Sequence, residues 1–223
     1  MSVNPTKLWE AKPHTIAKIV LLRSYLHVWF TILGRSFSGK DLWYIDGFAG
    51  PGEYSNYSAG SPVAAIQAAN SALVQTAANW RGGSIRCWFI EDTKAIFQNL
   101  ERVLGDLVPH SKVTYKTYCG TFIDGLSELR RQAQNPFHKN DPLFAFVDPF
   151  GPKGLSFTAV RELLSLPTCE VLVNLDSDGI ARVLFAGEAA NHKERLDEVF
   201  GDSDWEKDLV GCGHHQLVNR AAR

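Results

Sequence analysis

Short runs of apolar residues alternate with helix-like segments along most of this 223-residue chain. Two of the runs, "LFAFV" and "VLVNL", have the continuous apolar character of strands that are covered on both faces. Strands that alternate with helices form parallel sheets, because each parallel connection has to cross the sheet. The pattern therefore predicts an α/β fold, a three-layer α/β/α doubly wound and mostly parallel sheet of the Rossmann-like kind. The expected strands are residues 41–46, 84–92, 112–120, 142–151 and 169–176.

The first helix-like segment, residues 15–33, precedes the first strand and has apolar residues three and four positions apart. We interpret residues 1–40 as an N-terminal helical extension and residues 41–223 as one α/β domain. We interpret the basic side of the first helix as a solvated face, with a phosphate-contacting edge as the alternative. This basic side consists of Lys12, His14, Lys18 and Arg23. The further helices are expected at residues 60–78, with Ser61 as N-cap, and at 93–107, 122–134, 157–166 and 188–201.

The charge is nearly balanced, with 23 Lys and Arg against 24 Asp and Glu, a formal net charge of −1. Proteins that grip duplex nucleic acid alone are usually basic, so a nucleic-acid partner would need a local basic patch or a protein partner. No apolar run looks long enough to span a membrane, and no signal-peptide pattern precedes the first helix. The four cysteines never have C-x-x-C spacing, which indicates a reducing cytoplasm and no zinc ribbon. We predict no metal site, even at Cys212, His214 and His215.

The stretch "YIDGFAGPGEY" ends the first expected strand on Asp46 and then places three glycines within six residues. In doubly wound sheets, ligands bind outside the carboxyl ends of the strands, near the point where the strand order reverses. Glycine permits positive φ and lets the backbone approach a ligand closely. A tight turn without a ligand explains the same glycines equally well.

Three later loops should face the same crevice, because each follows a strand of the same sheet. Glu91 lies at the end of the second expected strand, where a carboxylate can bind ribose hydroxyls; Asp92 is a second candidate for this role, and a solvated acid or a helix cap is the alternative. The segment Gly120–Phe122 follows the third expected strand, where its residues could line an adenine pocket or could simply begin the next helix. Asp148 ends the fourth in "VDPFG", where an acid before proline suggests a site, although Asp-Pro also begins turns.

Together "DLWYIDGFAGPGEY", the following "GSPVAA", "FVDPFG" and the preceding helix resemble the three-Cys-motif partner protein family (TcmP) over roughly residues 7–200. That family is similar to the class I methyltransferases that use S-adenosylmethionine (SAM), in particular to ribosomal-RNA adenine-N6 methyltransferases. The resemblance implies SAM as the cofactor, with Glu91 at its ribose. The residues implied around the rest of SAM are Asp46, Gly47, Phe48, Ala49, Gly50 and Gly52 in the glycine loop, and Gly120, Thr121 and Phe122 near the adenine.

Adenine-N6 enzymes carry Asp/Asn-Pro-Pro-aromatic, whereas this chain has Asp148-Pro149-Phe150-Gly151. The resemblance implies that Asp148 and the Pro149 carbonyl accept the amino hydrogens of a base, while Phe150 stacks on it. Because the second proline is absent, two functions stay open. One is methyl transfer from SAM to a nucleic-acid base, and the other is a non-catalytic SAM- or nucleotide-binding subunit of a larger protein complex.

Class I methyltransferase sheets normally end in an antiparallel β-hairpin. Residues 178–223 have no alternating or apolar run of strand length, so we expect them to be mostly helical and the hairpin to be missing from them. A further segment or a partner would then cover the edge of the fifth strand, since natural sheets avoid exposed edges.

Overall fold

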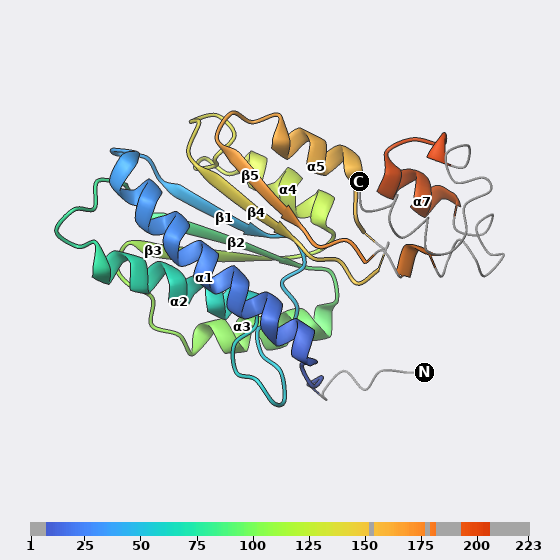
Figure 1. Cartoon of the computed structure of the whole chain (residues 1–223), viewed down its shortest axis with the longest axis horizontal. Coiled ribbons are helices and arrows are strands. Elements are labelled where there is room, and N and C mark those ends of the chain that lie inside the picture. Colours follow the sequence, from blue (N-terminus) through green and yellow to red (C-terminus); the bar gives the residue numbers. More distant parts are fainter. Residues whose placement is uncertain (1–7, 152–153, 177–178, 182–192, 206–223) are drawn as a thin grey trace.

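The computed structural model of the protein describes residues 8–151, 154–176, 179–181 and 193–205. It has an α/β fold built on a five-stranded, all-parallel sheet with the strand order β3-β2-β1-β4-β5 (Figure 1). The strands are β1 (Leu42–Asp46), β2 (Ile85–Glu91), β3 (Val113–Cys119), β4 (Leu143–Val147) and β5 (Cys169–Val173). The Rossmann-like parallel sheet predicted from the sequence is confirmed.

The strand order reverses between β1 and β4, which lie side by side at the centre of the sheet. Successive connections run from β1 through β2 to β3, and the chain then returns to place β4 on the other side of β1. Both central strands are buried throughout, as their apolar composition requires. The carboxyl ends of β1 and β4 therefore flank the position where doubly wound folds bind ligands.

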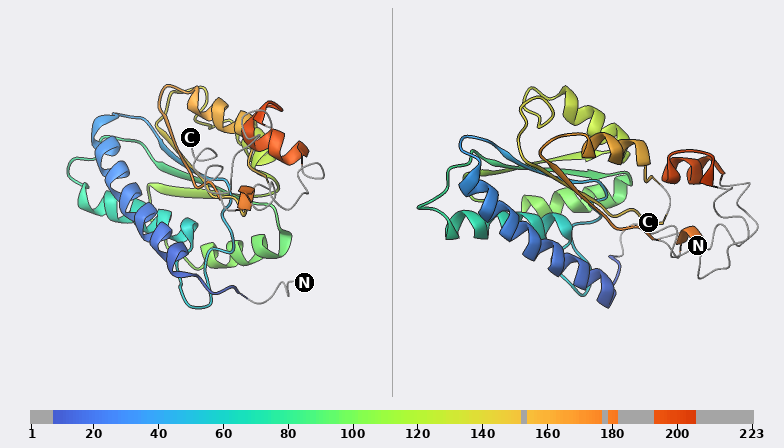
Figure 2. Two further views of the ribbon diagram at one scale, coloured as in Figure 1. Left: turned by 45° about the vertical axis from the view of Figure 1, so that its right-hand side comes forward. Right: turned by 45° about the horizontal axis from the view of Figure 1, so that its top comes forward.

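Helices cover both faces of the sheet (Figures 1 and 2). Alternate strand residues such as Tyr44 and Phe89 pack toward α1, α2 and α3, while Ile45 and Ile90 pack toward α4 and α5. The helices are α1 (Pro13–Ser36), α2 (Ser61–Gln75), α3 (Lys94–Gly105), α4 (Phe122–Arg131), α5 (Phe157–Leu164) and α7 (Lys193–Phe200). The expected cap of α2 is wrong by one residue: Gly60 is the N-cap and Ser61 is already helical.

Helix α1 is longer than expected, and it is long and apolar enough, by length and composition alone, to cross a membrane. The prediction that no segment is long enough to span a membrane is therefore wrong for α1. In this fold, however, one side of α1 belongs to the core that α1 shares with α2 and the sheet. Its buried residues include Leu22, Leu26, Trp29 and Phe30.

The edge strand β5 differs from the prediction, because its residues are alternately half-buried and exposed rather than covered on both faces. Its inward residues pack toward α5, whereas Glu170 and Leu172 lie on the side of α1. Tyr25 and Trp29 of α1 both donate hydrogen bonds to Glu170, at 2.5 and 2.8 Å. Among the described residues after β5 there is no strand, and most of residues 178–223 lie outside the described part.

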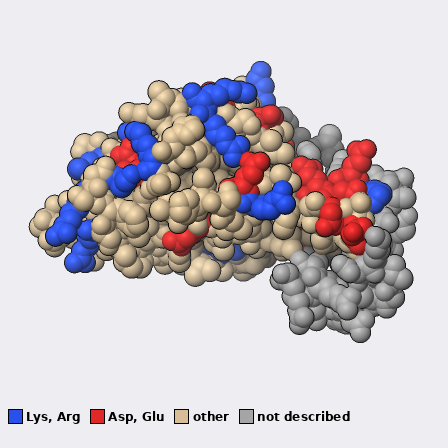
Figure 3. All heavy atoms as spheres, turned by 90° about the horizontal axis from the view of Figure 1, so that it is seen from above, with Lys and Arg blue, Asp and Glu red and all other residues tan. Residues whose placement is uncertain are grey.

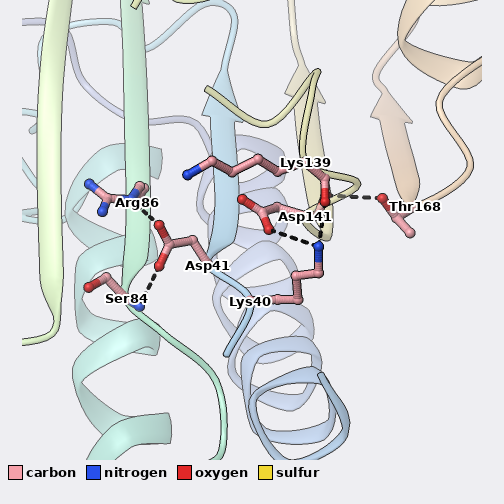
Figure 4. Close-up of polar contacts among 7 residues, drawn as sticks. All are labelled: Lys40, Asp41, Ser84, Arg86, Lys139, Asp141 and Thr168. Carbon is pink, nitrogen blue, oxygen red and sulfur yellow. Dashed lines mark hydrogen bonds and ion pairs between the residues drawn. The ribbon is translucent and has the colours of Figure 1, made fainter. Parts of the chain in front are cut away.

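Ion pairs and hydrogen bonds hold together the amino ends of the strands, at the end of the sheet away from the glycine loop (Figure 4). Asp41, just before β1, accepts hydrogen bonds from the backbone N of Ser84 (2.8 Å) and from Nε of Arg86 on β2 (2.6 Å). The backbone oxygen of Asp141, before β4, accepts from the Thr168 hydroxyl at 3.0 Å. These contacts fix the strand starts, and the carboxyl ends remain available for a site.

Candidate functional site

The glycine loop after β1 is tied to the strands on both sides of it. The backbone N of Gly47 donates to the oxygen of Phe146 on β4 (2.9 Å), and that of Ala49 donates to the oxygen of Ile90 on β2 (2.8 Å). The backbone N of Gly50 donates to a carboxylate oxygen of Glu91 at 3.0 Å. The loop therefore bridges the point where the strand order reverses.

Backbone conformation or close contact requires each of the three loop glycines, Gly52 having φ +80°. Gly50 has φ +63°, and a Cβ added to it would meet no protein atom within 4 Å. Gly47 packs so closely on the ring of Phe122 that an added Cβ would lie 2.7 Å from it. The loop thus opens toward free space at Gly50 and is closed against the core at Gly47.

Asp46 is completely buried at the end of β1. Its carboxylate accepts hydrogen bonds from the backbone N of Phe48 (3.3 Å) and from the hydroxyl of Tyr44 (3.2 Å), and Ser61 at the start of α2 adds another. The pKa of Asp46 is raised to about 7, mainly because burial disfavours the charged form; the hydrogen bonds from Ser61, Phe48 and Tyr44 oppose this rise, and the negative charge of Asp148 adds to it. Asp46 therefore holds the loop from inside the protein.

Glu91 connects the loop to the beginning of the next helix. One carboxylate oxygen accepts from Gly50, and the other accepts from the backbone N of Thr93 at 2.8 Å. Burial raises the pKa of Glu91, against the opposing effect of the bond from Thr93. The predicted contact with a ribose is not tested, but this carboxylate lies beside the open side of Gly50.

The segment after β3 is also a helix start, which was its alternative interpretation. The backbone N of Gly120 donates to the oxygen of Glu91 at 3.0 Å. Thr121 caps α4 by accepting from the backbone N of Asp124 at 3.2 Å. Phe122 is buried, and its ring centroid lies 5.7 Å from that of Phe48. The segment packs against the glycine loop, which brings the predicted adenine-binding residues and loop residues together.

Asp148 lies just beyond β4, and two other elements fix its carboxylate. One oxygen forms a 2.6 Å ion pair with the ammonium group of Lys18 on α1, and the other accepts from the side-chain amide of Asn174 after β5, also at 2.6 Å. Asp148 and Lys18 are 21% and 32% exposed, so both can be reached from outside. Pro149 is buried beside them.

Phe150 has the opposite environment, with 85% of its surface exposed. Its ring packs against that of Trp9 in an edge-type contact, with centroids 5.7 Å apart at an interplanar angle of 69°. The motif after β4 therefore presents an anchored acid and an outward-facing aromatic ring two residues apart.

Sequence reasoning missed several residues of this site. Lys18 was assigned to a solvated face, because helical periodicity shows which residues share a side but not what that side meets. Asn174 carries one recognisable signal, a polar residue directly after an apolar strand. Nothing in the sequence marks Trp9 or Tyr44 as part of a site.

Comparisons with known proteins do not assign this chain to a family. No protein-family model matches the chain, and no curated protein matches it. The resemblance to the three-Cys-motif partner family therefore stays a prediction. Among the described residues, no group of His, Cys, Asp and Glu side chains could hold a metal ion, and Cys212, His214 and His215 lie outside them.

The structure also has a hollow of about 640 Å³ between α1 and α2, lined by residues that include Arg23, His27 and Gln67. None of the predicted site residues lines it. The carboxyl ends of the strands remain the better candidate site, since the acids, the glycine loop and the exposed ring meet there.

Proposed function

We propose that this protein transfers a methyl group from SAM to a nucleic-acid base, with the exocyclic amine of adenine as the favoured acceptor. One observation carries the proposal. The glycine loop after β1 and the Asp148–Phe150 motif after β4 flank the same reversal of strand order, so that a cofactor and an acceptor bound at the two would adjoin.

The residues present fit a nucleoside cofactor. Gly50 leaves open space where a side chain would otherwise lie, and the carboxylate of Glu91 borders that space. Phe48 in the same loop is half-buried and would offer an apolar ring to the cofactor, with the buried ring of Phe122 packed against it. When bound, SAM supplies an electrophilic methyl group. Asp46 contributes through the loop that it holds.

The acceptor would be bound by the motif after β4. Asp148 accepts a hydrogen bond from the amine and is the nearest base for the proton that the amine loses, while the Pro149 carbonyl is a second acceptor. Lys18 and Asn174 hold the carboxylate in one orientation, which reduces the cost of ordering it during the reaction. Phe150 offers an exposed ring on which a base can stack.

The distribution of charge favours an approach of the nucleic acid along α1. Neither α1 nor α2 contains an acidic residue, and exposed Lys12 and His14 lie near the end of α1 that carries Lys18. On the face over α4 and α5, basic and acidic side chains are interspersed, and acids gather toward the α7 end (Figure 3). A phosphate backbone would therefore meet less repulsion on the α1 side.

A non-catalytic SAM- or nucleotide-binding subunit is the second candidate, and two observations favour it. Both oxygens of Asp148 already have partners within the protein. The N–H groups of Gly47, Ala49 and Gly50 are likewise used internally. Such a subunit would bind the cofactor and a protein partner without turnover.

Radiolabelled methyl transfer separates the two candidates. The purified protein is incubated with tritiated SAM and, in parallel, with bulk DNA, RNA and protein. The proposal expects label in nucleic acid, whereas the subunit alternative expects binding of S-adenosylhomocysteine without label in any acceptor. A protein that binds neither cofactor nor product contradicts methyl transfer, and the subunit alternative is contradicted as well if the protein also binds no nucleotide.

A further inference from the structure

The ring of Phe150 is exposed, yet it is not left without support. A side chain with so little of its surface buried would normally rotate among several conformations. Trp9, far away in the sequence, places its ring against Phe150 in an edge contact. Aromatic pairs prefer such edge-to-face geometry, which therefore restrains the orientation of the Phe150 ring.

Trp9 is held in place by the loop between β1 and α2. The backbone oxygen of Trp9 accepts from the backbone N of Ser55 (2.9 Å) and from its hydroxyl (3.2 Å). Two residues later, Ala11 and the Asn56 side chain exchange hydrogen bonds in both directions, at 2.7 and 3.0 Å. Four hydrogen bonds thus fasten the segment before α1 to this loop.

The same loop lies beside the acids of the site. Within it, Tyr54 pairs with Tyr57 across an isolated β-bridge. Burial raises the pKa of Tyr54 to about 12, and the negative charges of Asp148 and Asp46 add to the rise. Contacts therefore connect the loop, the segment that carries Trp9 and the motif after β4 near the carboxyl ends of β1 and β4.

We propose that Trp9 is a positioning residue for the acceptor: it orients Phe150 so that the free face of that ring receives a planar, unpaired base. The inference rests on the proposed function and specifies its substrate as a base in single-stranded or extruded form, because a ring can stack only on a base whose face is exposed. A base that stacks on a ring already held in place loses less conformational freedom on binding.

The test uses single-stranded DNA that contains one 2-aminopurine, whose fluorescence reports stacking of that base. Trp9→Ala and Asn56→Ala should each weaken binding about five- to tenfold, while Trp9→Phe should restore most of the affinity. Ser58→Ala is the matched control, since Ser58 is an exposed residue of the same loop for which the structure gives no bond to the segment that carries Trp9. Trp9→Ala should add nothing once Phe150→Ala has removed the ring.

Asn56→Ala is the decisive variant, because Asn56 reaches Phe150 only through the segment that carries Trp9. Wild-type affinity in Trp9→Ala or in Asn56→Ala, or additive losses in the Trp9→Ala/Phe150→Ala double variant, would overturn the inference. So would a wild-type protein that binds S-adenosylhomocysteine but not the probe, while the cofactor assignment would survive. Failure to bind S-adenosylhomocysteine contradicts the proposed function itself.

Discussion

A pair of glycines permits a controlled test of the cofactor site. Gly50 in the loop and Gly39 before β1 have nearly the same conformation, with φ +63° and +68°. At both positions an added Cβ would meet no protein atom within 4 Å. Gly50→Val and Gly39→Val therefore impose a similar backbone strain, but only Gly50 lies at the carboxyl ends of the strands.

The expected sizes follow from this geometry. A residue with a side chain costs roughly 1–2 kcal/mol in the left-handed region, and each 1 kcal/mol lowers Tm by about 2–4 °C in a protein of this length. Both variants should therefore lose about 2–8 °C. Gly50→Val alone also fills the space that a ligand would occupy, so its affinity for S-adenosylhomocysteine should fall at least about tenfold, or about 1.4 kcal/mol.

Thermal unfolding and titration calorimetry measure the two effects separately. Similar losses of Tm would show that both variants remain folded and are strained to a similar degree. Wild-type affinity for S-adenosylhomocysteine in Gly50→Val would refute the assignment of the glycine loop. An affinity loss in Gly39→Val as large as that in Gly50→Val would refute it as well, because the effect would then come from strain alone.

Three further variants test the acids. Asp148→Ala should abolish methyl transfer and leave affinity for S-adenosylhomocysteine nearly unchanged, because the carboxylate acts on the acceptor. Glu91→Ala should cost about 1–3 kcal/mol of stability and weaken cofactor binding, since it leaves the backbone N of Gly50 without its acceptor. Asp46→Asn should change the pH dependence of unfolding. Burial raises the pKa of Asp46 from 3.8 to about 7, so between these pH values the folded state keeps a proton that the unfolded chain has lost. Wild-type stability should thus fall by up to about 1.4 kcal/mol per pH unit as the pH rises through this range, and Asp46→Asn should lack that decline.

Each of these predictions has a contradictory result. Retained turnover in Asp148→Ala removes that side chain from the mechanism. Unchanged stability and affinity in Glu91→Ala would mean that water replaces the carboxylate at the loop. Denaturant unfolding with the same pH slope in wild type and Asp46→Asn would show that Asp46 is not the group that titrates.

The fold was largely predictable from the sequence, because the central strands are short apolar runs and because strand-like and helix-like segments alternate along the chain. Strands 41–46 and 142–151, expected from their apolar residues, correspond to the central β1 and β4. The edge position of β5 was not predictable, since an apolar run does not reveal whether a helix covers each side. The cap of α2 was missed because Gly60 fits a tertiary contact: its backbone N donates to the oxygen of Gly52 at 2.7 Å, where a side chain would collide.

The candidate site was predictable only in part. The motifs that follow β1 and β4 were expected to lie together, because the carboxyl ends of parallel strands meet at one edge of the sheet. The partners of Asp148 were not predictable in the same way. Lys18 and Asn174 come from elements far away in the sequence, and their meeting depends on how α1 crosses the sheet.

The most direct test of the proposed function is the product itself. The protein is incubated with SAM carrying a deuterated methyl group and with single-stranded DNA or RNA, and the nucleosides are then analysed by mass spectrometry, with Asp148→Ala as control. We predict deuterated N6-methyladenine with the wild-type protein and none with the variant. No deuterated base from either acceptor, under conditions where the protein binds S-adenosylhomocysteine, would contradict methyl transfer to nucleic acid and favour the binding subunit.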